Sequence, residues 1–228
     1  QTPDAGNNFA RRKAIVNDRA GNVSERAYDG RNRLVIETAY TGRAPDPDMP
    51  TTETANRPPG QLRGGDPAFF ERRYEYNDDS KRTRVTAPNG TVTRYVYELD
   101  LDPPAPRRSR GNLREAHRLP GGLGGDQAEI VELFEYDAGS GNCCGTNMVV
   151  RHVNGRGNET LHTYDAAGNR IHTRHRIPSI VEDFAYNAFG QLTQHTLPMN
   201  GSGFRRVDAF DYYAAGPQAG YLQSSRVD

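Results

Sequence analysis

One short motif recurs along the chain and dominates its local structure. It consists of a tyrosine, then an aspartate or asparagine, then a turn that contains glycine or asparagine, placed between runs of alternating polar and apolar residues. Its clearest copy is Tyr-Asp-Ala-Ala-Gly-Asn-Arg at 164–170, with variants at 28–34 and 186–192. Because glycine and asparagine tolerate the left-handed backbone of a tight turn, each copy predicts two antiparallel strands joined by a hairpin turn.

Six tyrosines begin a copy of this motif, three of them in looser form. We call them the repeat tyrosines: Tyr28, Tyr76, Tyr136, Tyr164, Tyr186 and Tyr212. The spacing is 28 residues from Tyr136 to Tyr164 and 22 residues from Tyr164 to Tyr186. A period that drifts in this range is typical of a repeat array with loop insertions. The sequence therefore predicts an array of β-hairpins.

The motif resembles the YD repeats of the Rhs family, which are shared with the C components of bacterial ABC toxins and with teneurins. The resemblance extends over most of the chain, from about residue 12 to residue 221, and is most specific at 164–170, with the Gly-Arg-Gly-Asn turn at 155–158 before it. It implies an all-β fold in which an antiparallel sheet of hairpins spirals into a hollow shell or tube. It also implies that the tyrosines stack in ladders between hairpins.

The alternating pattern predicts strands along most of the chain, and no segment has the pattern of an amphipathic helix. The expected strands are residues 12–18, 23–28, 33–40, 69–77, 81–87, 91–99, 113–118 and 129–136, three strands within 148–178, and 180–186, 191–197, 204–213 and 221–227. We expect residues 1–10 to form an extended lead-in. Residues 42–68 and 101–128 are expected to hold loop insertions within one array that spans residues 1–228.

The low apolar content limits the kinds of fold that the chain can adopt. Only 34% of the residues are hydrophobic, which is too few for a conventional compact core. Disorder is one explanation, and a thin sheet with a solvated face is another. The twelve tyrosines favour the sheet, because disordered chains are poor in aromatic residues. Arginines that alternate with aspartate and glutamate along the strands predict cross-strand ion pairs.

The net charge and the hydropathy of the chain argue against binding to nucleic acid and against a membrane span. The formal net charge is zero, so the chain has no overall electrostatic attraction for nucleic acid. No apolar run reaches the length of a transmembrane helix, so we expect no membrane span. The sequence begins without methionine or a signal peptide and stops inside a repeat. We therefore expect a piece of a longer protein, or a processed unit.

The only two cysteines, Cys143 and Cys144, are adjacent in an expected wide turn. Adjacent α-carbons are about 3.8 Å apart, less than the usual disulfide separation of about 4.4 to 6.8 Å. The pair is a candidate for a strained disulfide, for two free thiols or for a bond to another subunit. We do not expect a zinc site, because a second cysteine pair would be needed to complete it.

Three other patterns fall short of a metal or catalytic site. Gly121–Asp126 matches the first six positions of a calcium-binding nonapeptide repeat, but the calcium shell needs stacked copies. Rhs proteins often end their shell with an Asp-Pro-x-Gly motif tied to self-cleavage, whereas Asp102-Pro103-Pro104 lacks the glycine. The histidines are interpreted as polar strand residues: His117, His152, His162, His172, His175 and His195. We expect no catalytic residue, no cofactor, no metal and no enzyme activity.

Four Asn-x-Ser/Thr sequons lie on expected turns, where a glycan can be accommodated. The candidate glycosylation sites are Asn22, Asn89, Asn158 and Asn200. Sequons also arise by chance in a repeat rich in asparagine and threonine, and a bacterial source would usually leave them unmodified.

These features favour a structural protein, part of a secreted or cell-surface β-shell, tube or filament that encloses or displays cargo. Its expected partners are further repeats or other copies of the chain, with a toxin domain as cargo in the manner of Rhs proteins. The alternative is an extracellular module that binds carbohydrate or a cell-surface partner, because exposed tyrosines can stack on sugar rings. Stacking of the tyrosines on one another is the competing role for the same side chains.

Overall fold

The computed structural model describes residues 3–45, 57–101, 106–122, 127–137 and 147–227. These residues form fifteen β-strands, one short 3₁₀ turn, η1 (Glu98–Asp100), and no α-helix. The strands are β1 (Arg12–Asn17), β2 (Asn22–Tyr28), β3 (Leu34–Arg43), β4 (Phe69–Tyr76), β5 (Arg82–Thr86), β6 (Val92–Tyr97), β7 (Leu113–Leu119), β8 (Ile130–Tyr136), β9 (Val149–Val153), β10 (Glu159–Tyr164), β11 (Arg170–Arg174), β12 (Val181–Tyr186), β13 (Leu192–Met199), β14 (Arg205–Tyr212) and β15 (Leu222–Val227).

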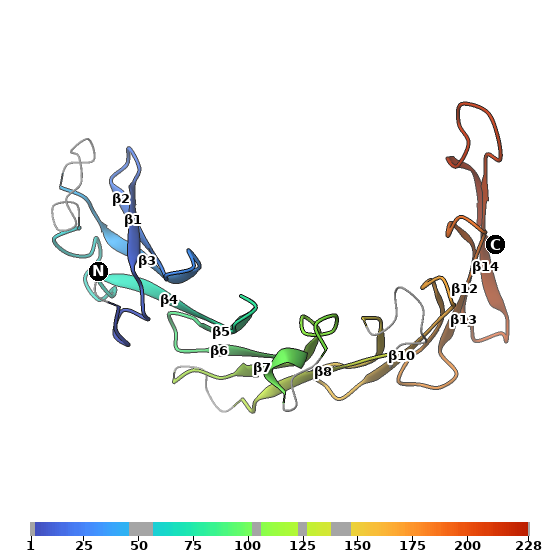
Figure 1. The fold of residues 1–228 in the computed structure, drawn as a ribbon, viewed down its shortest axis with the longest axis horizontal. Coiled ribbons are helices and arrows are strands. Elements are labelled where there is room, and N and C mark those ends of the chain that lie inside the picture. Colours follow the sequence, from blue (N-terminus) through green and yellow to red (C-terminus); the bar gives the residue numbers. More distant parts are fainter. Residues whose placement is uncertain (1–2, 46–56, 102–105, 123–126, 138–146, 228) are drawn as a thin grey trace. The chain divides into compact units, whose positions relative to one another are not determined.

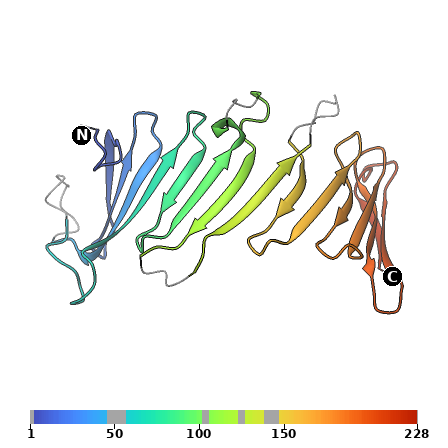
Figure 2. The same ribbon diagram turned by 90° about the horizontal axis from the view of Figure 1, so that it is seen from below.

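Neighbouring strands in the sheet follow the order of the sequence, from β1 to β15. The pairs are antiparallel, as where His162 faces Thr173 between β10 and β11. Figures 1 and 2 show one hairpin following another in the ribbon. Strands β1 and β15 each have one neighbour, so the sheet is not closed on itself. The prediction of an all-β antiparallel hairpin array is confirmed.

Strand β11 is shorter than the alternating pattern predicts. The pattern continues to Ile177, but the strand ends at Arg174. The next residues turn instead, because the amide of His175 donates to the carbonyl of Ile180 at 3.0 Å and the amide of Ile180 donates to Ile177 at 2.9 Å. Pro178, inside this turn, has no N–H with which to extend a strand ladder.

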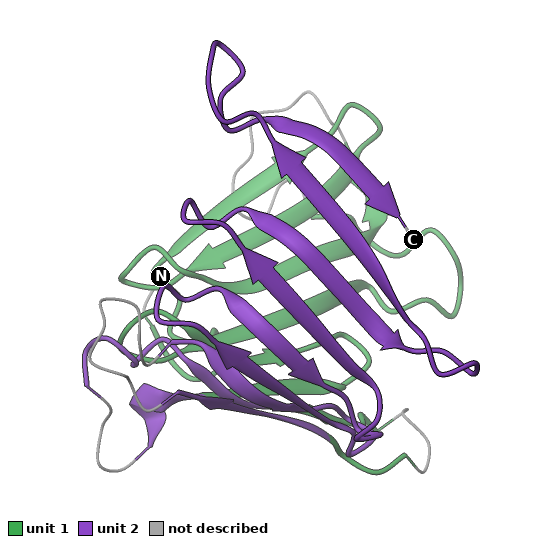
Figure 3. Ribbon diagram, turned by 90° about the vertical axis from the view of Figure 1, so that its right-hand side faces the viewer, with its two compact units in different colours: residues 1–96, 116–130 green, residues 97–115, 131–228 purple. Residues whose placement is uncertain are grey.

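The chain divides into two compact units, which Figure 3 shows in different colours. Unit 1 comprises Gln1–Val96 and Ala116–Ile130, and unit 2 comprises Tyr97–Glu115 and Val131–Asp228. The buried apolar cluster of the described residues lies in unit 1: Ala10, Ala27, Val35 and Ile36, with Tyr76 packed against them. In unit 2 the described strands other than β15, which is exposed throughout, are half-buried along most of their length, as expected for a thin sheet.

The prediction of an extended lead-in at residues 1–10 is wrong for the part that the structure describes. Residues 5–9 form turns, and Asn8 and Phe9 have φ values of 53° and 58°. The amide side chain of Asn8 donates to the carbonyl oxygens of Val35 at 3.0 Å and Tyr74 at 2.9 Å. Ala10, which follows, is fully buried. The segment is compact because it covers part of the apolar cluster and satisfies backbone carbonyls of β3 and β4.

Candidate functional site

Every repeat tyrosine is the last residue of its strand and lies at a β-bulge. Between β10 and β11, Thr163 faces His172 but Tyr164 faces Arg170, so Ile171 is an extra residue on β11. The same shift occurs at the other five repeat tyrosines: Tyr28, Tyr76, Tyr136, Tyr186 and Tyr212. A bulge bends its strand and increases the local twist. The repeat is therefore a repeated backbone irregularity as well as a repeated sequence.

The hydroxyl of the repeat tyrosine hydrogen-bonds to the backbone of the strand that precedes it. Five donate to the carbonyl oxygen of that strand's first residue: Tyr76 to Leu34 at 2.7 Å, Tyr136 to Leu113 at 3.0 Å, Tyr164 to Val149 at 2.9 Å, Tyr186 to Arg170 at 3.1 Å and Tyr212 to Leu192 at 2.9 Å. No such bond is found for Tyr28 in the described part of the chain. We call the tyrosine, its bulge and this bond the repeat junction.

Repeat junctions are connected to one another through these acceptors. Arg170 accepts the hydroxyl of Tyr186 and also faces Tyr164 across the bulge of the previous repeat. Leu192 does the same between Tyr212 and Tyr186. Four repeat tyrosines thus bind the backbone at the point where the previous repeat tyrosine ends its strand: Tyr76, Tyr164, Tyr186 and Tyr212. This linkage extends through consecutive hairpins of unit 2.

The expected ladder of stacked tyrosine rings is not found. Among the described residues, no ring contact joins two repeat tyrosines, and the aromatic pairs are Tyr40 with Phe69, Phe134 with His152, His162 with Tyr164, and Phe184 with His195. The reason is spacing, because successive repeat tyrosines are at least two strands apart. Strands about 4.8 Å apart place them about 9.6 Å or more from each other, beyond the 4.5–7 Å range of ring pairs.

The residue after the tyrosine organises the turn. The Asp165 carboxylate accepts the amides of Ala167 and Asn169, both at 2.9 Å, and the Asn169 side chain also at 2.9 Å. Gly168, the fourth residue of the turn, has φ of 90°. Hydrogen bonds from the Asn169 side chain and amide hold the pKa of Asp165 below its ordinary value of 3.8. An acid or amide at this position therefore stabilises a turn that glycine makes sterically accessible.

The same turn recurs between other pairs of consecutive strands. A side-chain oxygen accepts the amide four residues ahead at Asp18, Asp29, Asn77, Asn154, Asn187 and Asn200. The fourth turn residue has positive φ in each: Gly21, Asn32, Ser80, Gly157, Gly190 and Gly203. The sequence motif thus specifies both the turn and the repeat junction, and both of these support strand pairing.

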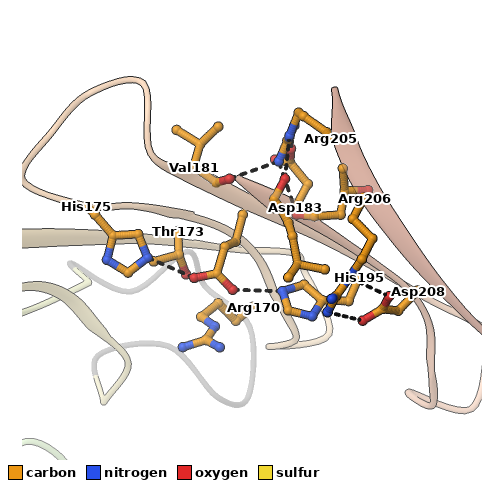
Figure 4. Close-up of polar contacts among 12 residues, drawn as sticks. Arg170, Thr173, His175, Val181, Asp183, His195, Arg205, Arg206 and Asp208 are labelled. Atoms are coloured by element: carbon orange, nitrogen blue, oxygen red, sulfur yellow. Dashed lines mark hydrogen bonds and ion pairs between the residues drawn. The ribbon is translucent and has the colours of Figure 1, made fainter. Parts of the chain in front are cut away.

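Unit 2 also contains a cluster of histidines and carboxylates on β11 to β14, part of which Figure 4 shows. The Glu182 carboxylate contacts His175 at 2.8 Å through one oxygen and His195 at 2.7 Å through the other. The Asp183 carboxylate contacts His172 and Arg205, both at 2.5 Å. Glu182 and Asp183 are adjacent on β12, so these contacts lie on opposite faces of the sheet.

The cluster shifts the pKa values of its carboxyl groups. The hydrogen bond from His175 is the largest influence on Glu182 and, with that from His195, holds its pKa below 4.5. Burial alone would raise the pKa of Asp183, but hydrogen bonds from His172 and Arg205 outweigh it, so the pKa lies below 3.8. Both carboxyl groups therefore stay ionised at a lower pH than they would in the unfolded chain.

Phe184 and Arg205 make the remaining contacts of the cluster. The ring of His195 stacks on that of Phe184 with centroids 4.6 Å apart. Arg205 donates to the carbonyl oxygens of Val181, Thr196 and Leu197 at 2.8–3.1 Å. Strand β13 is irregular there, because Pro198 has no N–H to donate to the ladder, and the Arg205 guanidinium donates to carbonyls beside the irregularity.

The arrangement holds strands together and does not form a metal site. Within the described residues, no group of three or more His, Cys, Asp or Glu side chains is placed to hold a metal ion. The sequence indicates polar strand residues at the histidine positions but does not identify their carboxylate partners. The signal available was Glu182-Asp183, an adjacent acidic pair that meets histidine-bearing strands on both sides.

Unit 1 has a charged pocket of about 260 Å³ centred on Glu25. Its carboxylate accepts from Arg57 at 2.7 and 3.1 Å and from the Tyr40 hydroxyl at 3.2 Å, and lies 2.9 Å from the Lys13 ammonium. Burial alone would raise the pKa of Glu25, but the hydrogen bonds from Arg57 and Lys13 outweigh it and lower the pKa below 4.5. Burial, with the charge of Glu25, raises the pKa of Tyr40 to about 12. Glu25 thus pairs with both cations that line this pocket, Lys13 and Arg57.

Cross-strand ion pairs occur as expected from the alternating charges. Examples are Arg26 with Glu37 at 3.5 Å, Arg84 with Glu75 at 3.7 Å, and Arg151 with Glu135 and Glu159. Most are exposed, and an exposed pair contributes about 0–1 kcal/mol. They contribute more to strand register and to solubility than to the free energy of folding.

Some candidate residues lie outside the described part of the chain. These are Cys143, Cys144, the Asp102-Pro103-Pro104 sequence and the last four residues of the Gly121–Asp126 stretch. The sequon asparagines are all described, with Asn22, Asn89 and Asn200 exposed and Asn158 half-buried. The Oδ1 atoms of Asn89 and Asn200 accept amides of their own turns, at 3.0–3.1 Å. Their glycosylation stays a prediction.

No family model and no curated protein matches the chain in sequence. Among solved structures, it is similar to a chain in the crystal structure of TcdB2-TccC3-Cdc42, with a TM-score of 0.43 and 11% identity over 96% of this chain and 13% of that one. Chains in the TcdB2-TccC3-TEV and TcdB2-TccC3 structures give TM-scores of 0.26 and 0.27, at 10% and 9% identity. These two cover 91% of this chain and 15% and 16% of their own lengths. The chain thus spans less than a fifth of each, and scores this low define neither its fold nor its function.

Among the residues that the structure describes, no helical segment has the length and apolar content that crossing a bilayer requires.

Proposed function

We propose that the chain is a non-enzymatic structural protein, one stretch of a wall of β-hairpins that encloses or displays cargo at the cell surface or after secretion. The repeat junction carries this proposal. Five of the six repeat tyrosines use their hydroxyl to bind the backbone of a neighbouring strand. The most repeated residues of the chain therefore join strands, rather than converge on a reacting centre.

The polar clusters support the same function. In both units, buried or half-buried charges pair across strands, as Glu25 does with Lys13 and Glu182 does with His195. Opposite charges that face each other on neighbouring strands contribute to the pairing of those strands. The resemblance of the motif to YD repeats is a second, independent support for a wall that surrounds a cargo such as a toxin domain.

A wall of this kind needs partners at its edges. Strands β1 and β15 each have one neighbour, and an unpaired edge tends to recruit another strand. In this proposal further repeats, or other copies of the chain, pair with those edges and close the sheet into a shell or tube, or extend it into a filament.

Electron microscopy of the complete gene product that contains this chain tests the proposal. Negative-stain images are expected to show hollow capsules, tubes or fibres. Solid particles with no lumen and no extended form would contradict it. A protease-protected segment that becomes sensitive when the particle is opened would identify the cargo.

A second candidate function is recognition of a cell-surface partner, and exposed aromatic side chains on the hairpin turns of unit 2 favour it. Phe189 is 88% exposed, Phe204 is 73% exposed and Tyr221 is 69% exposed. Aromatic side chains exposed on turns are available to contact a partner. A glycan array tests the carbohydrate form of this candidate, and a flat response would count against it.

A further inference from the structure

The last repeat junction departs from the repeat at the residue that follows the tyrosine. Asp or Asn occupies this position after the other five repeat tyrosines, but Tyr213 follows Tyr212. The turn that follows is also longer, and backbone bonds alone close it, from the Tyr213 amide to Tyr221 at 3.0 Å and from the Gly220 amide to Tyr213 at 2.8 Å. A structural residue has therefore been replaced by an aromatic one. Such departures from a local rule are expected at functional positions.

The neighbouring turn, residues 187–191, contains a second unusual aromatic residue. Phe189 is 88% exposed. The turn needs only its backbone, because the Phe189 amide donates to the Asn187 side chain at 2.9 Å. In the turns at 165–169 and 29–33, the equivalent position holds Ala167 and Arg31. The phenyl ring therefore has no role in the turn that a small or charged residue could not replace.

These two turns of unit 2 lie side by side and border a partly open pocket. The Gln191 side chain joins them by donating to the carbonyl of Gly220 at 2.6 Å. The pocket has a volume of about 400 Å³ and is lined by the rings of Phe189, Tyr212 and Tyr213, among others. None of its lining residues is charged, in a chain of which 25% of the residues are charged. Its size is within the usual range of about 300–1,000 Å³ for ligand pockets.

The polar groups of the pocket are largely committed to the protein itself. The Asn187 amide group donates to Gln191 at 2.8 Å, and its oxygen accepts two turn amides. The Tyr212 hydroxyl donates to Leu192. Among the described residues, the Tyr213 hydroxyl has no hydrogen-bond partner. A sugar buried here would leave several hydroxyls unpaired, which is costly, whereas an apolar side chain would not.

We propose that this pocket, which we call the turn pocket, receives an aromatic or large aliphatic side chain from an uncharged segment of a protein partner. The proposal rests on the second function proposed above and names its site and the chemistry of its partner. Aromatic anchors that enter desolvated pockets supply most of the affinity of many interfaces. The Tyr213 hydroxyl is placed to pair with the polar tip of a tryptophan or tyrosine anchor.

The chain contains no tryptophan, so indole fluorescence reports a tryptophan probe alone. N-acetyl-tryptophanamide titrated with the folded chain is expected to show a blue shift that saturates, with a dissociation constant in the range of about 1 mM for so small a ligand. N-acetyl-lysinamide and methyl glucoside are expected not to displace it. Displacement by methyl glucoside would overturn the proposal in favour of a carbohydrate site.

Two variants locate the binding. Phe189→Ala is expected to weaken probe binding at least about tenfold, because it removes one wall of the turn pocket. Phe204→Ala, which removes another exposed ring on a turn outside the pocket, is expected to leave binding unchanged. Equal affinity in the two variants, or no fluorescence change with the native chain, would overturn the proposal.

The failure of this proposal would leave the structural function untouched. Neither Phe189 nor Phe204 belongs to a repeat junction, so unfolding curves and electron micrographs of both variants are expected to match those of the native protein. Loss of the probe signal with intact hollow particles would refute the turn pocket alone, whereas solid particles that bind the probe would refute the wall alone.

Discussion

The Tyr186 hydroxyl donates a 3.1 Å hydrogen bond to the carbonyl oxygen of Arg170, the first residue of the neighbouring strand. Arg170 also faces Tyr164 across a β-bulge, so one backbone position connects two successive repeats. The tyrosine ring spans one inter-strand gap, and its hydroxyl serves an acceptor at a position where the regular ladder is interrupted. Tyrosine is suited to this position because it combines a large apolar ring with a polar tip.

Removal of one junction hydroxyl should destabilise the sheet modestly. Tyr164→Phe retains the half-buried ring but leaves the Val149 carbonyl without its 2.9 Å donor. The free energy of unfolding, measured with urea, is expected to fall by about 1 kcal/mol. Tyr95→Phe is the matched control, since the Tyr95 hydroxyl has no partner among the described residues, and should change little. Equal stability of the two variants would refute a contribution from the junction bond.

The acidic turn residue should matter more than the junction hydroxyl. Asp29 is 8% exposed, and its carboxylate accepts the Arg31 amide at 2.8 Å, the Arg33 amide at 3.0 Å and the Arg33 guanidinium at 2.7 Å. Asp29→Ala is expected to cost about 2 kcal/mol of unfolding free energy, and Asp29→Asn less, because it retains one acceptor. Asp78→Ala is the control, since that side chain is 94% exposed and 3.8 Å from Arg31. A loss at Asp78 as large as that at Asp29 would contradict the turn's role.

Two glycines of one turn allow the cost of backbone strain to be measured apart from the cost of steric crowding. A Cβ added at either Gly201 or Gly203 would meet no atom within 4 Å, but of the two only Gly203 has positive φ, at 83°. Gly203→Ala is expected to destabilise the protein by about 1–2 kcal/mol, the cost of a left-handed alanine. Gly201→Ala is expected to be neutral or slightly stabilising. Thermal unfolding of both variants checks this, and the reverse order would show that the turn conformation is misassigned.

The Glu182 cluster should make stability depend on pH in the acidic range. The pKa of Glu182 is lowered from 4.5, first by the hydrogen bond from His175. A lowered pKa means that the unfolded chain takes up the proton first, so the contribution of Glu182 is complete above pH 4.5 and is lost as the pH falls through the folded-state pKa. Glu182→Gln should be less stable than the native protein at neutral pH, and the difference should shrink on acidification.

The control for this titration is an exposed carboxylate. Glu75 is 3.7 Å from Arg84, and its side chain is 54% exposed. Glu75→Gln is expected to follow the native stability at every pH, because exposed pairs contribute little. A difference for Glu182→Gln that stays constant with pH would show that its effect comes from packing and not from its charge.

The strands and turns were largely predictable because their signals are local. Asn89-Gly90 specified a turn through two adjacent residues, and strand alternation around it required no knowledge of distant contacts. The start of the chain was not predictable in this way. Asn8 owes its left-handed conformation to acceptors on Val35 and Tyr74, which are 27 and 66 residues away. A turn that depends on such contacts cannot be distinguished in sequence from an extended segment.

The role of the repeat tyrosines was predictable only in part. Their positions at strand ends follow from the motif, but the expectation that rings such as those of Tyr164 and Tyr186 stack on one another ignored the strand that separates them. The bulge was equally hidden, because Ile171 continues the alternating pattern although it has no partner opposite. Register and bulges are properties of strand pairs, and a pattern within one strand does not reveal them.

The dense contacts of the sheet join strands that are consecutive in the chain. Each hairpin can therefore close as soon as its two strands have left the ribosome, so folding can proceed in step with synthesis. The turns between strands also tolerate added sequence, since doubling the length of a loop costs only about 0.6 kcal/mol of closure entropy. An architecture of this kind can gain or exchange surface loops over evolution while its strand ladder stays in place.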